Sequence, residues 1–149
     1  MVSETRERAG RGFEFLPHTA DKAIEAWGGT VPELFCAAAE GMFSLSEDLD
    51  AIGRQQEWAV EVEADSLEDL LHAWLSELLW VAERDEAVPC EFEVEALSEN
   101  PWRLRARARG GPAPRETPHT GAPVKAVTYH ELRIWQQDGL WRGHVVFDV

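Results

Sequence analysis

The sequence is short of the residues on which several classes of protein depend. Its two cysteines, Cys36 and Cys90, stand far apart, without the spacing of a zinc site or a disulfide framework, and are expected to be reduced and buried. Only 14 lysines and arginines stand against 28 acidic residues, which gives a formal net charge of -14. Because affinity for nucleic acid comes mainly from Lys and Arg on phosphates, this charge disfavours direct RNA or DNA binding. It favours a cation, or a partner with a basic face.

Long apolar runs are also missing. No stretch reaches the roughly 20 apolar residues that span a membrane. The charged residues 1–12 lack the apolar core of a signal peptide, so we expect a cytoplasmic protein with no membrane partner. We interpret residues 1–12 as a flexible lead-in and residues 13–149 as a single domain, since a chain of this length with 44% hydrophobic residues can build one core.

The signatures of common enzyme sites are absent as well. There is no nucleophile elbow, no glycine-rich phosphate loop and no paired-cysteine zinc motif, so the sequence favours a protein that is not itself an enzyme. What remains is a group of polar residues, each at the end of an expected strand or in a loop beside one. They are His18, Asp21, Lys125, His130, Asp148 and the carboxylate of Val149.

Two amphipathic helices are indicated by the spacing of apolar residues. The first follows Thr30, a candidate N-cap with Glu33 at the capping-box position, and continues to about residue 45. The second follows Ser66, and its apolar residues over 67–79 recur at i, i+3, i+4 and i+7. Each helix therefore has one wide apolar stripe to bury.

Alternation of apolar and polar residues predicts strands before, between and after the helices. They are expected over 13–16, 22–27, 57–64, 91–97, 103–109, 124–135 and 140–149, with a hairpin turn at 137–139. This order predicts an α+β fold. The simplest packing has two layers, with two helices on one face of a single mixed, mostly antiparallel sheet.

Two of the expected strands carry opposite charges on one face. Glutamates alternate along 91–95 and arginines along 103–109, on either side of a turn at 99–101. In a hairpin they would face each other, at about 0.2–1 kcal/mol per cross-strand pair. We interpret the arginines as part of a structural ladder, with a nucleic-acid patch as the alternative. Residues 110–123, rich in Gly and Pro, are expected to form a long loop.

Spacing alone leaves two interpretations of the aspartates open. Carboxylates with a main-chain or terminal oxygen suit a hard cation such as Ca²⁺, Mg²⁺ or Mn²⁺. Alternatively, Asp21 accepts hydrogen bonds in a turn completed by His18 and Thr19, and Asp148 is an exposed terminal residue.

Segments spread over nearly the whole chain resemble the archease family. They are "FEFLPHTADKAIEAWG", "LFCAAAEGMFSL", "DSLEDLLHAWLSELLW", "VKAVTYHELRI" and the terminal "VVFDV", in the family's order from residue 13 to residue 149. The resemblance implies a small acidic co-factor protein of RtcB-type RNA ligases, which act in tRNA splicing and RNA repair. Such a protein promotes guanylylation and turnover of the ligase. A chaperone or specificity modulator of a tRNA methyltransferase is the first alternative, and a small metal-dependent hydrolase the second.

The same resemblance assigns roles to individual residues. Asp21, Asp148 and the C-terminal Val149 match the family's divalent-metal site, with calcium, magnesium and manganese as candidates. Lys125 matches a lysine that would contact the ligase or a phosphate of its nucleotide. His18 and His130 match further motif positions, where a role toward the partner competes with a packing role.

Overall fold

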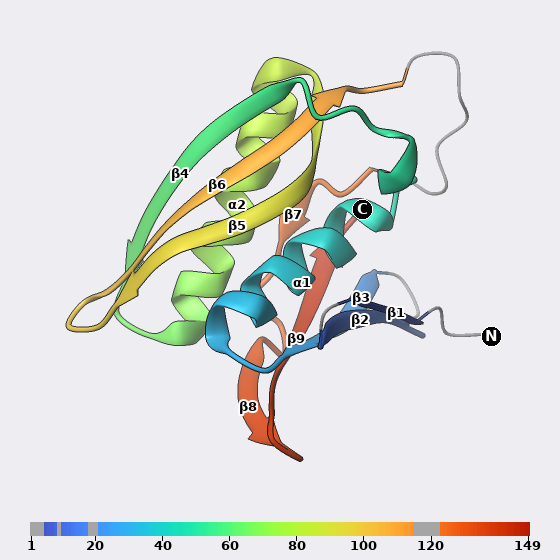
Figure 1. Ribbon diagram of the computed structural model, residues 1–149. Helices are drawn as coiled ribbons and strands as arrows, with labels where there is room; N and C mark the ends of the chain where they lie inside the picture. The colour runs from blue at the N-terminus through green and yellow to red at the C-terminus, as the bar shows by residue number, and fades with distance from the viewer. Residues whose placement is uncertain (1–4, 9, 18–20, 115–122) are drawn as a thin grey trace.

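The computed structural model describes residues 5–8, 10–17, 21–114 and 123–149 (Figure 1). The strands of the first half are β1 (Thr5–Arg8), β2 (Arg11–Leu16), β3 (Lys22–Gly28) and β4 (Gln56–Ala64). Those of the second half are β5 (Ala87–Ser98), β6 (Trp102–Pro112), β7 (Ala126–Val127), β8 (Arg133–Gln137) and β9 (Leu140–Asp148). The helices are α1 (Val31–Ser44), the 3₁₀ turn η1 (Leu49–Ala51) and α2 (Leu67–Asp85).

The described strands form two separate antiparallel sheets. The first, sheet A, has the order β1-β2-β3-β9-β7, with β8 also paired to β9; the second, sheet B, has the order β4-β6-β5. The expected α+β class and antiparallel pairing are confirmed. The division into two sheets corrects the expected single mixed sheet. Alternation shows which face of a strand is buried, but it does not show which strand lies beside it.

Each helix contacts both sheets. Helix α1 packs on β2, β3 and β9 of sheet A and on β5 of sheet B, and α2 packs on β4 to β6 and on β7 and β8 (Figure 1). The expected two-layer packing on one face therefore differs from the structure. The reason lies in α1, where ten of the 14 residues are buried, so that its apolar surface extends well beyond one stripe.

Local sequence signals for helix starts and turns are confirmed. The Thr30 hydroxyl accepts a hydrogen bond from the Glu33 amide at 3.2 Å, and the Ser66 hydroxyl accepts one from the Asp69 amide at 3.1 Å. Between β8 and β9, Asp138 and Gly139 both have positive φ, at 54° and 76°. This is the conformation that a two-residue hairpin turn of type I′ requires.

The charge ladder is also confirmed, and it is wider than expected. Strand β6 lies between β4 and β5, so its arginines have glutamates on both sides. The Arg107 guanidinium lies 2.8 Å from the Glu57 carboxylate on β4 and 3.5 Å from that of Glu95 on β5. Arg103 pairs with Glu63 at 3.4 Å. These contacts support the structural interpretation of the arginine row.

Three stretches differ from the expected boundaries. Strand β1 and the start of β2 lie inside residues 1–12, the expected lead-in, and Arg11 forms an ion pair with Glu40 of α1 at 2.6 Å. Strand β6 extends to Pro112, into the expected loop 110–123, and residues 115–122 lie outside the described part. The expected strand 124–135 is divided into β7 and β8, with a turn at 130–131 between them.

The cysteines are both buried and free. Burial raises the pKa of the Cys36 thiol to about 11, so it stays protonated at neutral pH. A protonated, buried thiol is a packing group and a poor nucleophile. In the described part of the chain, no helix combines the length and the hydropathy needed to cross a membrane.

Candidate functional site

One end of sheet A collects most of the polar residues that the sequence singles out. Strand β3 begins at Lys22, β9 ends at Asp148, and β7 begins at Ala126. Strand β9 lies between the other two, with Ala126 paired to Asp148 and Lys22 paired to Phe147. Residues distant in sequence therefore meet at this sheet end.

The two candidate metal-binding aspartates stand at the same level of the sheet. Lys22 and Phe147 are the last pair between β3 and β9, and Asp21 and Asp148 occupy the next position along each chain. Residues opposite each other in an antiparallel pair have Cβ atoms about 4.5–5.5 Å apart. Asp21 is half-buried and Asp148 is exposed. The structure thus places both aspartates next to the last β3–β9 pair, at the same end of sheet A, which spacing alone left open.

The lysine of the site is fixed through its backbone. The Lys125 amide donates a hydrogen bond to the Asp148 carbonyl at 2.8 Å, while the Lys125 side chain is exposed. The half-buried Val149 directly follows Asp148. Lys125, Asp148 and Val149 therefore share the sheet end with Asp21.

The structure describes only one of the two candidate histidines. His18 lies outside the described residues. His130 lies in the turn after β7, where its Nε2 atom is 3.8 Å from the Glu131 carboxylate and its side chain is 63% exposed. This ring contact lies within its own turn, and among the described residues no ion pair of the His130 ring reaches Asp21 or Asp148.

The donor groups at the sheet end fit a hydrated divalent cation better than a closed protein cage. Among the described residues, no three His, Cys, Asp or Glu side chains form a cluster that could hold a metal ion. The side chains of Asp21 and Asp148 are two carboxylates at this sheet end. These are hard oxygen ligands, and Mg²⁺ in particular is commonly held by one or two carboxylates with several waters. The residues present therefore suit such an ion.

Two histidines that no motif marked hold the segment that follows Lys125. His72 of α2 is half-buried, and its Nε2–H donates to the Val127 carbonyl at 3.0 Å. Its ring stacks on that of Tyr129, with centroids 3.8 Å apart and planes 7° apart. On the other side, the buried His144 of β9 donates from Nδ1 to the Glu131 carbonyl at 2.8 Å.

Sequence patterns could not have revealed these two roles. A single histidine beside an apolar helical stripe, or inside an apolar strand, has no spacing that predicts its partner. The bonds become visible only when α2, β7 and β9 are placed together.

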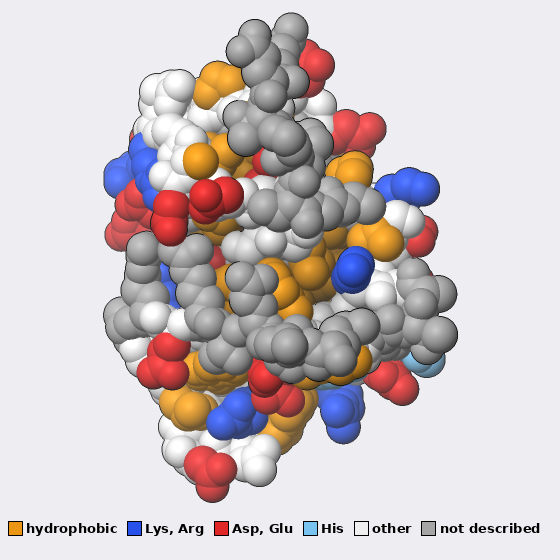
Figure 2. All heavy atoms as spheres, turned by 90° about the vertical axis from the view of Figure 1, so that its right-hand side faces the viewer, with side chains coloured by type: hydrophobic (Ala, Val, Ile, Leu, Met, Phe, Trp, Pro, Cys, Tyr) orange, Lys and Arg blue, Asp and Glu red, His pale blue; other side chains and the backbone are white. Residues whose placement is uncertain are grey.

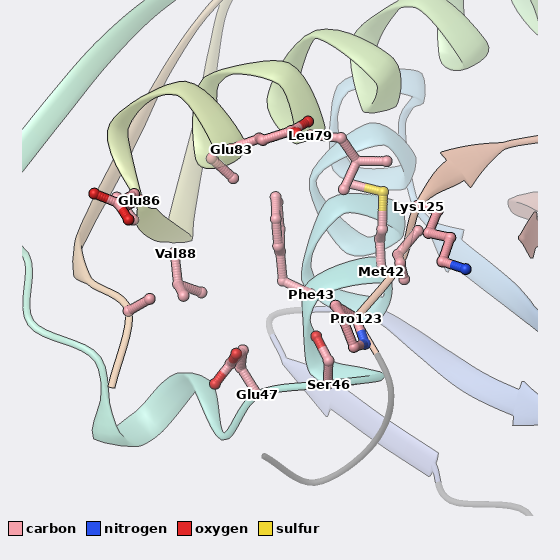
Figure 3. Close-up of a pocket in the computed structure, with 14 residues that line it drawn as sticks. Met42, Phe43, Ser46, Glu47, Leu79, Glu83, Glu86, Val88, Pro123 and Lys125 are labelled. Carbon is pink, nitrogen blue, oxygen red and sulfur yellow. The ribbon is translucent and has the colours of Figure 1, made fainter. Parts of the chain in front are cut away.

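A cavity of about 640 Å³ adjoins the sheet end (Figure 3). Its wall includes the last turns of α1 and α2, the start of β5, and residues 123–125. Lys125 belongs both to this wall and to the sheet end. On the side of the molecule seen in Figure 2, hydrophobic side chains show at the surface between acidic and basic ones.

Comparison with known proteins identifies close relatives over the full fold. Residues 13–149 match the model of the Archease protein family. The chain is 38% identical to Protein archease of Methanopyrus kandleri over 138 residues, which cover 92% of this chain and 99% of that protein. It is 37% identical to Protein archease of Methanosarcina mazei over 142 residues, covering 94% and 97%.

Solved structures agree with these matches. The solution structure of protein 1598 of Methanobacterium thermoautotrophicum has a TM-score of 0.78 and 31% identity, covering 92% of this chain and 98% of that one. The crystal structure of an archease from Thermotoga maritima, described as a possible chaperone, has a TM-score of 0.60 and 21% identity, covering 90% and 94%. The second likeness concerns the fold alone.

Proposed function

The chain belongs to the archease family, and from this premise we propose that it is a non-enzymatic activator of an RtcB-type RNA ligase in tRNA splicing and RNA repair. The observation that carries the proposal is the sheet end, where Asp21 and Asp148 stand at one level and Lys125 is bonded to the Asp148 carbonyl. The proposed place of action is the cytoplasm, where the ligase would meet its RNA.

The proposed mechanism is to complete the ligase's active-site region. Asp21, Asp148 and the Val149 carboxylate would hold a divalent ion at this end of the sheet. Such an ion would supply positive charge to neutralise the charge that develops on phosphate during nucleotidyl transfer. The exposed Lys125 amine contacts the ligase or a phosphate of its GTP, since a lysine is a compact positive charge on a flexible stem. The ligase forms the guanylate and performs the chemistry, and this protein turns over no substrate.

The first prediction concerns these three side chains. Asp21→Ala, Asp148→Ala and Lys125→Ala should each abolish stimulation of ligase guanylylation under multiple turnover, at least tenfold below the wild type. None of the three belongs to the buried core, so each truncation should leave the melting temperature within a few degrees of the wild type.

A matched control is Glu99→Ala, which removes an exposed carboxylate from the β5–β6 turn, outside the sheet end. It should keep most of the stimulation. Full stimulation by Asp21→Ala would contradict the metal-holding role. Loss of stimulation together with a collapsed melting temperature would mean that the aspartate is structural.

A second candidate function has one observation in its favour. The Thermotoga maritima protein of the same fold is described as a possible chaperone, and the chaperone hypothesis for a tRNA methyltransferase uses the same fold with a different client. The guanylylation assay separates the two, because a methyltransferase chaperone would leave the ligase's rate unchanged.

A further inference from the structure

The cavity beside Lys125 has an apolar interior. Met42 and Phe43 of α1 are almost fully buried, and Leu79 of α2 is half-buried. Figure 3 shows the Met42 and Leu79 side chains directed into the space between the helices, with the Lys125 amine pointing away from them. An apolar interior with an open mouth is a surface on which burial of a partner's apolar side chains would be favourable.

The mouth of the cavity is acidic. Glu47, Glu83 and Glu86 all belong to its wall, and Lys125 is the single basic residue among the wall residues described. The cavity also lies where α1 and α2 end, and a helix C-terminus carries partial negative charge on its last carbonyls. Helix α1 has no basic residue in its last turn to offset this, whereas α2 has Arg84, which is paired with Asp85. The field at the mouth therefore attracts cations and opposes phosphates and other anions.

We propose that this cavity is a docking pocket for a short segment of the client ligase in which apolar side chains adjoin Arg or Lys. The proposal rests on the proposed function, because it commits the occupant to that ligase. The apolar side chains would enter between Phe43 and Leu79, and the basic group would lie against Glu83 and Glu86. The shared residue Lys125 makes the pocket continuous with the sheet end, so one partner can contact both.

The pocket and the sheet end then have separate tasks. Docking in the pocket sets the affinity for the ligase, and the sheet end acts on guanylylation once the ligase is bound. A volume of about 640 Å³ lies within the range of ~300–1,000 Å³ for sites that bury most of a ligand, so it suits a short segment better than a single side chain.

The test is a titration of purified RtcB-type ligase with this protein and its variants. Glu83→Lys reverses a charge on an exposed residue at the pocket mouth, and Glu99→Lys makes the same change in the β5–β6 turn, outside the pocket. Glu83→Lys should weaken binding at least tenfold, and Glu99→Lys less than twofold. The difference should shrink as salt is raised, because exposed charges are screened.

An uncharged variant tests the apolar half of the pocket. Ala82→Phe places a ring on a half-buried wall residue and should weaken binding without changing the charge. At saturating concentration, Glu83→Lys should still support full guanylylation, whereas Asp21→Ala should bind normally and fail to stimulate. That pair of results would support the separate tasks.

The opposing results are equally specific. Suppose that the wild type binds the ligase and that Glu83→Lys and Ala82→Phe both bind it with the same affinity. The docking role of the pocket is then wrong, while the proposed function still stands. No binding of the ligase by the wild type overturns both. A third result would also overturn the proposal. If Glu83→Lys weakens binding to a tRNA methyltransferase but does not weaken binding to the ligase, the pocket serves another client.

Discussion

At the scale of single residues, the candidate site depends on side chains that never touch it. His72 bonds the Val127 carbonyl and stacks on Tyr129, and His144 bonds the Glu131 carbonyl. Both fix the chain just after Lys125. The position of the Lys125 backbone against Asp148 is therefore supported from α2 and from β9.

A prediction follows for His72→Ala. The Val127 carbonyl loses its donor and Tyr129 loses its stacking partner, at a cost of about 1–3 kcal/mol for a polar group left unpaired. The amides of Lys125 and Thr128, which donate to Asp148 and Val146, should exchange hydrogen at least fivefold faster than in the wild type. Hydrogen exchange read by NMR measures this directly.

The control for this experiment is His130→Ala, which removes a histidine without a bond to the β7 backbone through its ring. It should leave both exchange rates unchanged. His72→Gln, which keeps a donor near Val127, should restore part of the protection. Equal exchange in wild type and His72→Ala would show that the histidine does not hold this segment.

At the scale of elements, sheet B contains the pattern of opposite charges that the sequence alone predicted. The arginines of β6 lie between the glutamates of β4 and β5, and Arg107 contacts carboxylates on both sides. No ion pair joins Arg105 to another described residue. The two arginines therefore form a natural comparison within one strand.

The expected result is a small, salt-dependent difference. Arg107→Gln should lower the free energy of unfolding by up to about 1 kcal/mol, since exposed ion pairs contribute little. Arg105→Gln should lower it by less. Urea denaturation at low salt and at about 1 M salt measures both, and the difference should vanish at high salt because screening is then nearly complete. A difference that persists in salt would indicate packing of the Arg107 stem instead.

Helix caps and turns were more predictable from the sequence than the pairing of strands. The caps at Thr30 and Ser66 and the turn at Asp138-Gly139 are local, so a short stretch of sequence determines them. The pairing of β3 with β9 joins opposite ends of the chain, and no periodicity encodes it. For the same reason, the sequence could mark Asp21 and Asp148 as ligand types, but their place at the same end of sheet A needed the structure.

At the scale of the whole molecule, charge is the dominant property. The formal net charge is -14, and three arginines of the ladder, Arg103, Arg107 and Arg109, contact glutamates. Few cationic side chains are therefore available to contact phosphates. We predict no measurable binding of tRNA alone at about 0.15 M salt, where nonspecific affinity for phosphates is already reduced.

A gel-shift titration of labelled tRNA with this protein checks the prediction. Adding the ligase should produce a shift that the protein alone does not. Submicromolar binding by the protein alone would contradict it, and would revive the nucleic-acid interpretation of the arginine row.

The central place of β9 in sheet A has a consequence for synthesis on the ribosome. Strands β1, β2 and β3 emerge early, but the edge of β3 finds its partner only when β9 appears, almost the whole length of the chain later. Until then the nascent sheet has an open edge, of the kind that pairs with other chains. Sheet B and the helices can form first, since their strands are complete by Pro112. The acidic end of sheet A is therefore assembled last, and a polypeptide whose translation stops before Asp148 lacks one of its two aspartates.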